Sequence, residues 1–129
     1  MILLDTQAIA WLAMAPEKLS PAADAAIEAA RQDGGIAIAD KSLWEIAMMI
    51  QKRKIEVHIP LREFLQGIEQ YCTVLPVTSA VAALSVQLSA NFPNDPADRI
   101  IAATAIVHGM KLVTSDALIR KSGEVSCIW

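Results

Sequence analysis

Two carboxylates and an arginine open an otherwise apolar segment, Asn94-Asp95-Pro96-Ala97-Asp98-Arg99-Ile100-Ile101-Ala102-Ala103-Thr104-Ala105. Aspartate followed by proline is a typical helix start, because the carboxylate caps the first turn and proline suits the first helical position. Asp95 is explained in this way as an N-cap. Asp98 could face the positive end of the helix dipole, but the apolar composition after it predicts a buried helix. A carboxylate at this place needs a further reason.

Short apolar strands alternate with helices on both sides of this segment. We expect strands at residues 2–4, 36–39, 73–77, 111–114 and 125–128, and helices at residues 7–14, 21–33, 42–52, 61–71, 80–88, 96–108 and 116–120. In this prediction Ser42 heads the third helix and Ser79 caps the fifth. Each parallel crossover needs a helix to return the chain, so the pattern predicts an α/β fold with a mainly parallel five-stranded sheet and helices on both faces.

Length and composition predict one domain over residues 1–129, since 54% of the residues are hydrophobic and can form a core. No apolar run approaches the ~20 residues of a membrane-spanning helix, and the N-terminus lacks the basic region of a secretory signal, so we expect a cytoplasmic protein with no membrane partner. The two cysteines, Cys72 and Cys127, both fall inside apparent strands and are too few for a disulfide framework. We interpret both as core residues.

The charge balance limits the possible ligands. A net charge of -3 and a pI near 5.3 argue against a protein that coats nucleic acid by bulk electrostatics. A polyanionic ligand would need a local attraction, such as a bound divalent cation.

Acidic residues follow the strands at the positions where parallel sheets bind ligands. Asp5 comes directly after the first strand and Asp116 two residues after the fourth, and ligands bind beyond the carboxyl ends of such strands. Each acid also has a structural explanation: Asp5 and Asp116 as N-caps, Glu45 as the capping-box partner of Ser42, and Asp98 as a dipole acid. Four carboxylates in one cleft would repel one another unless a cation neutralised them, and oxygen ligands suit Mg²⁺ or Mn²⁺.

Four blocks in this order resemble one known family. Leu3-Leu4-Asp5-Thr6, Ser42-Leu43-Trp44-Glu45-Ile46, the segment Asp95 to Ala105, and Leu112-Val113-Thr114-Ser115-Asp116 are similar to the PIN-domain ribonucleases, specifically the VapC-type toxins of bacterial toxin-antitoxin pairs. The resemblance covers essentially the whole chain.

The resemblance implies a three-layer α/β/α sandwich whose catalytic residues, Asp5, Glu45, Asp98 and Asp116, bind one or two Mg²⁺ or Mn²⁺ ions. It also implies metal-assisted hydrolysis of RNA, a homodimer, and inhibition by a small cognate antitoxin. A non-catalytic RNA- or partner-binding module that retains the fold stays open as the alternative. A receiver domain or a haloacid-type phosphatase fits poorly, because no second acid stands beside Asp5 and Gln7 occupies the second position of an Asp-x-Asp pair.

Other polar and aromatic residues keep two interpretations each. Arg99 either holds phosphate or serves as a surface or ion-pairing charge. The basic turn Lys52-Arg53-Lys54 either guides RNA or complements the dipole at the end of a helix. Thr6, Thr114 and Ser115 could orient carboxylates or waters. The aromatic and sulfur-containing side chains could form a partner surface or pack in the core; they are Trp11, Trp44, Met48 and Met49.

Overall fold

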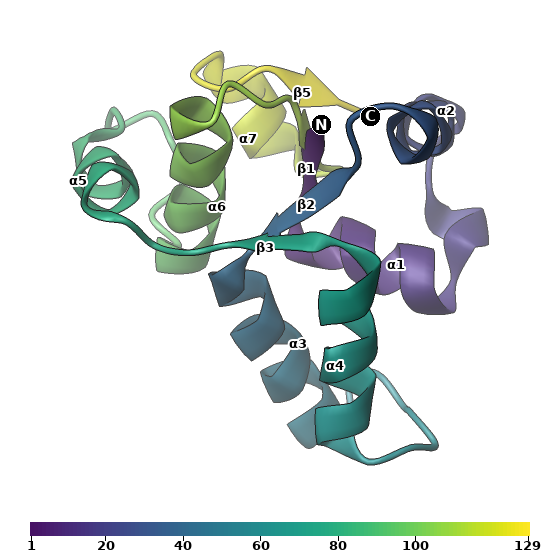
Figure 1. Ribbon diagram of the computed structural model, residues 1–129. Coiled ribbons are helices and arrows are strands. Elements are labelled where there is room, and N and C mark those ends of the chain that lie inside the picture. The colour runs from purple at the N-terminus through teal and green to yellow at the C-terminus, as the bar shows by residue number, and fades with distance from the viewer.

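A computed structural model describes all residues from Met1 to Trp129, and its elements alternate between strands and helices (Figure 1). The strands are β1 (Ile2–Leu4), β2 (Ile36–Ala39), β3 (Thr73–Leu75), β4 (Leu112–Val113) and β5 (Cys127–Ile128). The α-helices are α1 (Thr6–Met14), α2 (Pro21–Gln32), α3 (Asp40–Gln51), α4 (Leu61–Tyr71), α5 (Ser79–Gln87), α6 (Pro96–Val107) and α7 (Ala117–Ser122), and a 3-10 turn, η1, covers Pro16–Lys18. No helix combines the length and the apolar character needed to cross a membrane.

The five strands form one sheet in the order β3-β2-β1-β4-β5, and every neighbouring pair is parallel. The predicted parallel α/β fold is therefore confirmed, and the sheet is wholly rather than mainly parallel. β1 lies at its centre and pairs with β2 through Leu3 and Ala37 and with β4 through Leu3 and Leu112.

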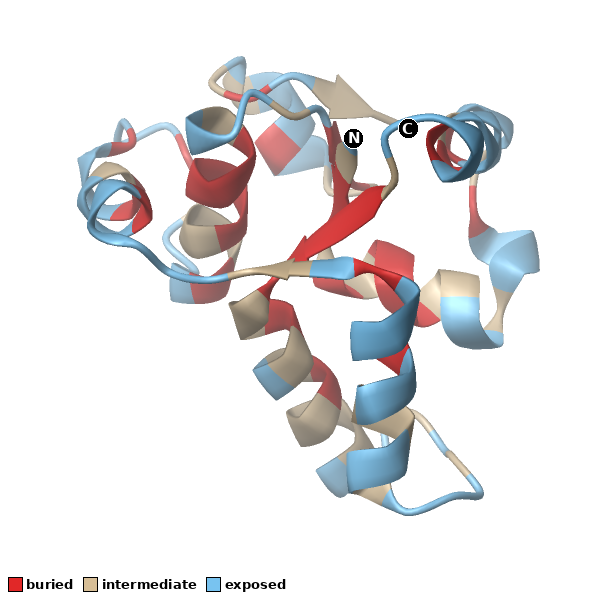
Figure 2. Ribbon diagram, in the orientation of Figure 1, coloured by how far each residue is buried: buried red, intermediate tan, exposed pale blue.

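Alternate strand residues feed two hydrophobic clusters, one on each face of the sheet. Leu4, Ile38 and Val113 join side chains of α1, α2, α3 and α4. Leu3 and Leu112 join side chains of α5, α6 and α7. Figure 1 shows these helix groups on opposite sides of the sheet. Figure 2 shows β1, β2 and the helix faces turned toward them as buried, whereas the edge strands β3 and β5 are intermediate or exposed. The arrangement is the expected three-layer sandwich.

The strand order reverses between β1 and β4, and this reversal defines a switch point where ligands bind in parallel sheets. The chain reaches the carboxyl edge through β3 and must return to the amino edge before β4. α6 makes that return, so its N-terminus lies at the carboxyl edge. Asp98, in the first turn of α6, therefore lies at the carboxyl edge of the sheet, which strand order alone did not decide.

Three local predictions were wrong. Ser42 does not head α3, because the helix begins at Asp40 with Ala39 as its N-cap and without a side-chain cap. Ser79 does not cap α5, because the Thr78 hydroxyl accepts the hydrogen bond from Val81 N at 3.3 Å. Cys72 lies at the C-cap of α4 rather than in a strand, although it is buried and free as expected, and burial raises the pKa of its thiol to about 11.

Several boundaries agree closely with the prediction. β2 and α4 have the expected limits, and Gly109, with φ of 65°, follows the end of α6. Only glycine adopts such a φ without strain, which explains why the helix stops there. β3, β4 and β5 are each shorter than expected.

Candidate active site

One pocket of about 300 Å³ brings the four predicted acids together. It opens at the carboxyl edge of β1 and β4, and α1, α3 and α6 contribute to its wall. The residues that line it are Asp5, Thr6, Gln7, Glu45, Met49, Asp98, Ile101, Ser115 and Asp116. Positions that are up to 111 residues apart in sequence, from 5 to 116, therefore share one cleft.

Asp5 and Asp116 are held by the helices that they begin. Asp5 Oδ1 accepts a hydrogen bond from Ala8 N at 2.7 Å. Asp116 Oδ1 accepts hydrogen bonds from Leu118 N at 2.9 Å and Ile119 N at 3.1 Å. Both residues are thus N-caps, as the structural explanation predicted, but each cap uses one named oxygen. Capping consequently fixes the carboxylate and leaves its second oxygen available to a ligand.

The environment of Asp5 disfavours its charge. Burial raises the pKa of Asp5 above its usual value, the Thr114 hydroxyl and the Ala8 N–H lower it in part, and the charges of Asp116 and Glu45 raise it further. A cation in the pocket would reverse the balance, because it would favour the ionised form.

Glu45 lies in the second turn of α3 and is not part of a capping box. Its Oε1 accepts a hydrogen bond of 2.5 Å from the Thr6 hydroxyl, and that hydroxyl is also hydrogen-bonded to Ser42 at 3.0 Å. The early start of α3 produces this contact, since it turns Ser42 into the protein and toward α1. The capping explanation of Glu45 is therefore excluded.

Asp98 is the carboxylate with the least local support. Its backbone N–H donates to Asp95 Oδ1 at 3.1 Å, which confirms Asp95 as the N-cap of α6, but no hydrogen bond reaches the Asp98 side chain. Burial, together with the smaller effect of the charges of Asp95, Asp116, Glu45 and Asp5, raises the pKa of Asp98 to about 7. Asp98 is half-buried, faces other carboxylates and has no hydrogen-bond donor on its side chain. This environment matches a site in which a bound ligand supplies the balancing positive charge.

The donor set fits a hard divalent cation. Mg²⁺ and Mn²⁺ prefer carboxylate oxygens and keep several waters, and this pocket offers four carboxylates around a polar space. No group of three or more His, Cys, Asp or Glu side chains lies close enough together to hold a metal ion by itself. Capping of Asp5 and Asp116 and the hydrogen bond of Glu45 hold the carboxylates apart, so the pocket suits an ion that retains waters better than one that is fully enclosed by protein.

Arg99 does not point at the pocket as a phosphate ligand. Its five N–H groups donate to five backbone carbonyls at the end of α5 and in the loop before α6: Pro93, Ser85, Leu88, Ser89 and Phe92, at 3.0 to 3.4 Å. Neither the phosphate interpretation nor the ion-pair interpretation describes it. Arg99 instead holds the α5–α6 loop against the helix that carries Asp98.

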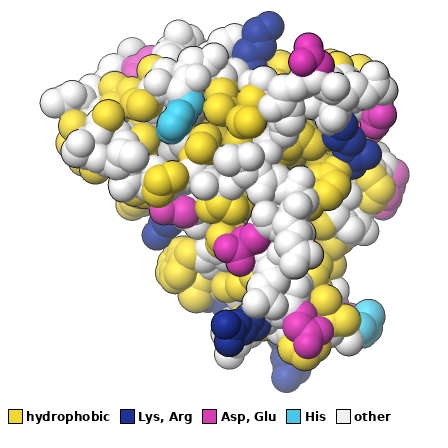
Figure 3. All heavy atoms as spheres, in the orientation of Figure 1, with side chains coloured by type: hydrophobic (Ala, Val, Ile, Leu, Met, Phe, Trp, Pro, Cys, Tyr) yellow, Lys and Arg dark blue, Asp and Glu magenta, His cyan; other side chains and the backbone are white.

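Lys and Arg side chains are few on the face of the molecule shown in Figure 3, and they are scattered rather than gathered into one patch. Lys52 is the C-cap of α3, which fits the dipole interpretation of the basic turn, and Arg53 there adopts a φ of 57°.

Trp11 packs against Trp129 with ring centroids 5.7 Å apart, whereas Trp44 is 55% exposed with Lys41 over its ring. The two tryptophans thus have different roles.

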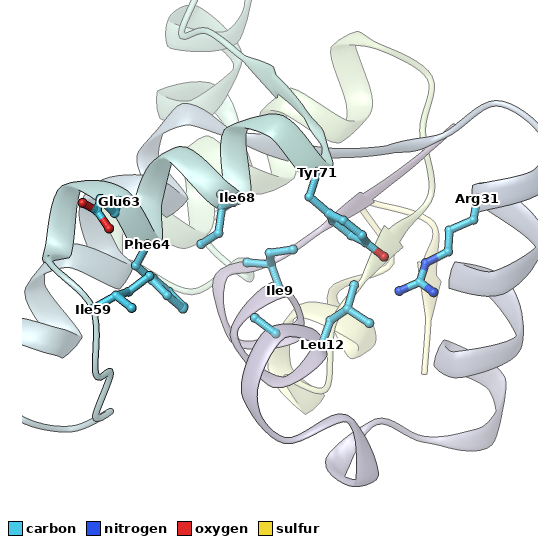
Figure 4. Close-up of a pocket in the computed structure, with 10 residues that line it drawn as sticks. Ile9, Leu12, Arg31, Ile59, Glu63, Phe64, Ile68 and Tyr71 are labelled. Atoms are coloured by element: carbon cyan, nitrogen blue, oxygen red, sulfur yellow. The ribbon is translucent and has the colours of Figure 1, made fainter.

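A second cavity of about 300 Å³ is mostly apolar and lies between α1, α2 and α4 (Figure 4). Its walls are formed by Ile9, Leu12, Ala13, Arg31, Ile59, Glu63, Phe64, Gly67, Ile68 and Tyr71. We call it the apolar groove. The sequence pattern alone did not predict this groove, although Phe64, Ile68 and Tyr71 on α4 have the spacing of side chains on one helix face.

The fold and the pocket define a class: parallel α/β proteins with a cluster of carboxylates at the switch point of the sheet. The PIN domain family model matches residues 2–124. The chain is also 40% identical over 119 residues to Ribonuclease VapC22 of Mycobacterium tuberculosis, which covers 92% of this chain and 89% of that protein. The protein belongs to the PIN domain family, and its resemblance to the VapC type is confirmed.

Solved structures support the same fold. VapBC2 from Rickettsia felis, solved with a DNA fragment from its promoter, matches with a TM-score of 0.75 and 16% identity over 98% of this chain and 97% of that chain. A toxin-antitoxin complex from Klebsiella pneumoniae matches with a TM-score of 0.64 and 21% identity over 90% and 87% of the two chains. At these identities the likeness concerns the fold alone.

Proposed function

We propose that the protein is a divalent-metal-dependent ribonuclease that acts as the toxin of a toxin-antitoxin pair. The observation that carries the proposal is the pocket in which Asp5, Glu45, Asp98 and Asp116 meet at the switch point. The relative Ribonuclease VapC22 supports the choice of RNA as substrate, and the toxin-antitoxin complexes among the structural neighbours support the antitoxin as partner. We place its action in the cytoplasm, where the RNA is.

The chemistry is hydrolysis of a phosphodiester, in which a water oxygen bonds to phosphorus while the bond to the leaving oxygen breaks and that oxygen receives a proton. One or two Mg²⁺ or Mn²⁺ ions bound by the four carboxylates would supply electrostatic stabilisation and an activated water. Asp5 and Asp98 are the principal ligands in this proposal. Glu45 binds the ion or orients water, and Asp116 contributes its free oxygen directly or through water.

The side chains also prepare the pocket for a polyanion. The chain has a net charge of -3, and four carboxylates without a cation would repel RNA phosphates. The same carboxylates would bind the divalent cation, and the charge of that cation would then attract a phosphate group. Metal binding and substrate binding are consequently coupled, since each depends on the same four side chains.

The antitoxin would bind at the apolar groove rather than only at the carboxylates. The groove is the more apolar of the two cavities described, and exposed Ile59 and Tyr71 form part of its rim. α1 links the two sites, because Thr6 lines the pocket while Ile9 and Leu12 line the groove. We also propose a homodimer, to which the exposed apolar side chains Trp44 and Val86 are suited; light scattering of purified protein tests it.

The decisive experiment is cleavage of a mixed, structured RNA pool by antitoxin-free protein with Mg²⁺, with Mn²⁺ and with chelator. Asp98→Asn keeps the shape of the side chain and removes its charge, so metal-dependent cuts should disappear in that variant. Asp24→Asn, on the exposed face of α2, is the matched control and should cut as the wild type does. If folded wild-type protein binds no metal and cuts no RNA, the non-catalytic binding module becomes the better account.

A further inference from the structure

Two hydroxyl groups lie behind Glu45, at the junction of α1 and α3. Ser42 is fully buried and Thr6 is 8% exposed. The Thr6 hydroxyl is hydrogen-bonded to both Ser42 Oγ and Glu45 Oε1. The three side chains therefore form a continuous path from the protein interior to the edge of the pocket.

The direction of the protons in this path follows from the groups involved. A carboxylate only accepts hydrogen bonds, and a hydroxyl has one proton to donate. Thr6 consequently donates to Glu45, and the Ser42 hydroxyl supplies the proton of its own hydrogen bond to Thr6. This order leaves Thr6 with a single orientation in which it can satisfy both neighbours.

Other helical hydroxyls in the chain behave differently. Ser85 donates to Ala82 O at 2.7 Å and Thr104 donates to Ile100 O at 2.7 Å, so each bonds to a carbonyl of its own helix. Ser42 and Thr6 instead connect two helices, and the connection ends on a carboxylate of the pocket. Ordinary satisfaction of a buried hydroxyl would not require that carboxylate.

Glu45 is held by a side chain rather than by the backbone. Asp5 and Asp116 are fixed by backbone N–H groups, whereas the Glu45 side chain is longer and receives only the hydrogen bond from Thr6. Partners of metal-binding carboxylates typically determine how well those carboxylates are placed.

We propose that Ser42 and Thr6 are positioning residues: Ser42 orients the Thr6 hydroxyl, and that hydroxyl holds the Glu45 carboxylate toward the pocket. The inference rests on the proposed function, because it assigns Glu45 to the metal site. Neither hydroxyl touches the metal or the substrate in this scheme. Ser42 acts through Thr6, and Thr6 acts through Glu45.

The test measures Mn²⁺ affinity by calorimetry on the antitoxin-free full chain, with RNA cleavage as a second readout. Thr6→Val removes the hydroxyl and keeps the shape, Thr6→Ser keeps the hydroxyl, and Ser42→Ala removes the member of the path farthest from the pocket. Ser85→Ala is the matched control, since it removes an equally buried hydroxyl that serves only its own helix. Circular dichroism and melting in chelator establish that each variant is folded.

We expect Thr6→Val to weaken Mn²⁺ binding by about 10- to 100-fold, the usual effect of losing an outer hydrogen-bond partner of a metal ligand. Ser42→Ala should weaken it less, because Thr6 can still donate to Glu45. The double variant should be no weaker than Thr6→Val alone, since Ser42 has no path to Glu45 without the Thr6 hydroxyl. Thr6→Ser and Ser85→Ala should bind as the wild type does.

Two results would overturn the inference while leaving the proposed function in place. One is unchanged Mn²⁺ affinity in folded Thr6→Val when the wild type binds the ion. The other is a double variant whose loss equals the sum of the single losses, which would mean that the two hydroxyls act independently. Wild-type protein that binds no Mn²⁺ would instead refute the proposed function, and this inference with it.

Discussion

Replacing Arg99 with methionine should destabilise the fold strongly although the residue is partly exposed. Methionine keeps an apolar stem of similar length and removes every hydrogen bond of the guanidinium. Among the five acceptor carbonyls, those of Ser85, Leu88 and Phe92 belong to buried residues, whereas those of Ser89 and Pro93 can bind water instead.

The size of the effect follows from those three buried acceptors. An unsatisfied buried acceptor costs about 1 kcal/mol or more, so three of them give a loss of about 3 kcal/mol in the free energy of unfolding. For a domain of this size 1 kcal/mol corresponds to roughly 4 °C in Tm, and we expect a fall of about 12 °C. Arg99→Lys should recover less than half of it, because an ammonium group lacks the planar fork that reaches several carbonyls.

Thermal melting in chelator measures the loss without interference from metal binding. Arg120→Met is the control: Arg120 is exposed and makes one long hydrogen bond of 3.4 Å to Ser115 O, so its Tm should change little. An Arg99→Met protein that melts within about 3 °C of the wild type would refute the reasoning. If that stable variant also failed to bind RNA, the phosphate interpretation of Arg99 would be the correct one.

Other predictions concern the carboxylates and the groove. In chelator, the free energy of unfolding should fall as the pH rises from about 4 toward 7. The reason is that Asp98 has a pKa of about 7 in the folded state and therefore keeps a proton that the unfolded chain has already released. Equal pH slopes for wild type and Asp98→Asn in melting experiments would contradict this. Asp95→Asn should retain activity and stability, since asparagine also caps helices, whereas Asp95→Ala should lose about 1 kcal/mol in urea denaturation. Ile46→Ala, at a fully buried position, should lose about 2 to 5 kcal/mol in the same assay. Ile59→Glu should weaken antitoxin binding in a calorimetric titration and leave RNA cleavage unchanged, because Ile59 is half exposed at the rim of the groove.

The parts of the structure that depend on local signals could be predicted from sequence. The apolar run of β2 and the spacing of α4 gave their boundaries, and Asp5, Asp95 and Asp116 are N-caps as their neighbours in sequence indicated. These features arise within a few residues, so a short window contains their cause.

The parts that depend on distant contacts could not be predicted in this way. Ser42 and Glu45 have the spacing of a capping box, and the same spacing also suits two side chains of α3 that meet Thr6, which is 36 residues before Ser42. Only the packing of α3 against α1 distinguishes the two arrangements. Arg99 is a similar case, because its acceptors lie 6 to 14 residues away and are backbone atoms that leave no trace in the sequence.

The site residues were predicted as a set more firmly than as individuals. Asp5 and Asp116 follow strands, so their common edge follows from the parallel sheet. The edge of the sheet at which Asp98 lies depends on the direction of α6. The strand order β3-β2-β1-β4-β5 determines that direction only once the path from β3 to β4 is known.

The wide spacing of the four acids along the chain has a consequence for protein synthesis. A segment that contains all of them must run from residue 5 to residue 116, and β4, which precedes the last of them, must pair with the central strand β1. A growing chain on the ribosome therefore has no complete pocket until most of its length has emerged. A chain terminated before residue 116 would likewise lack the complete pocket.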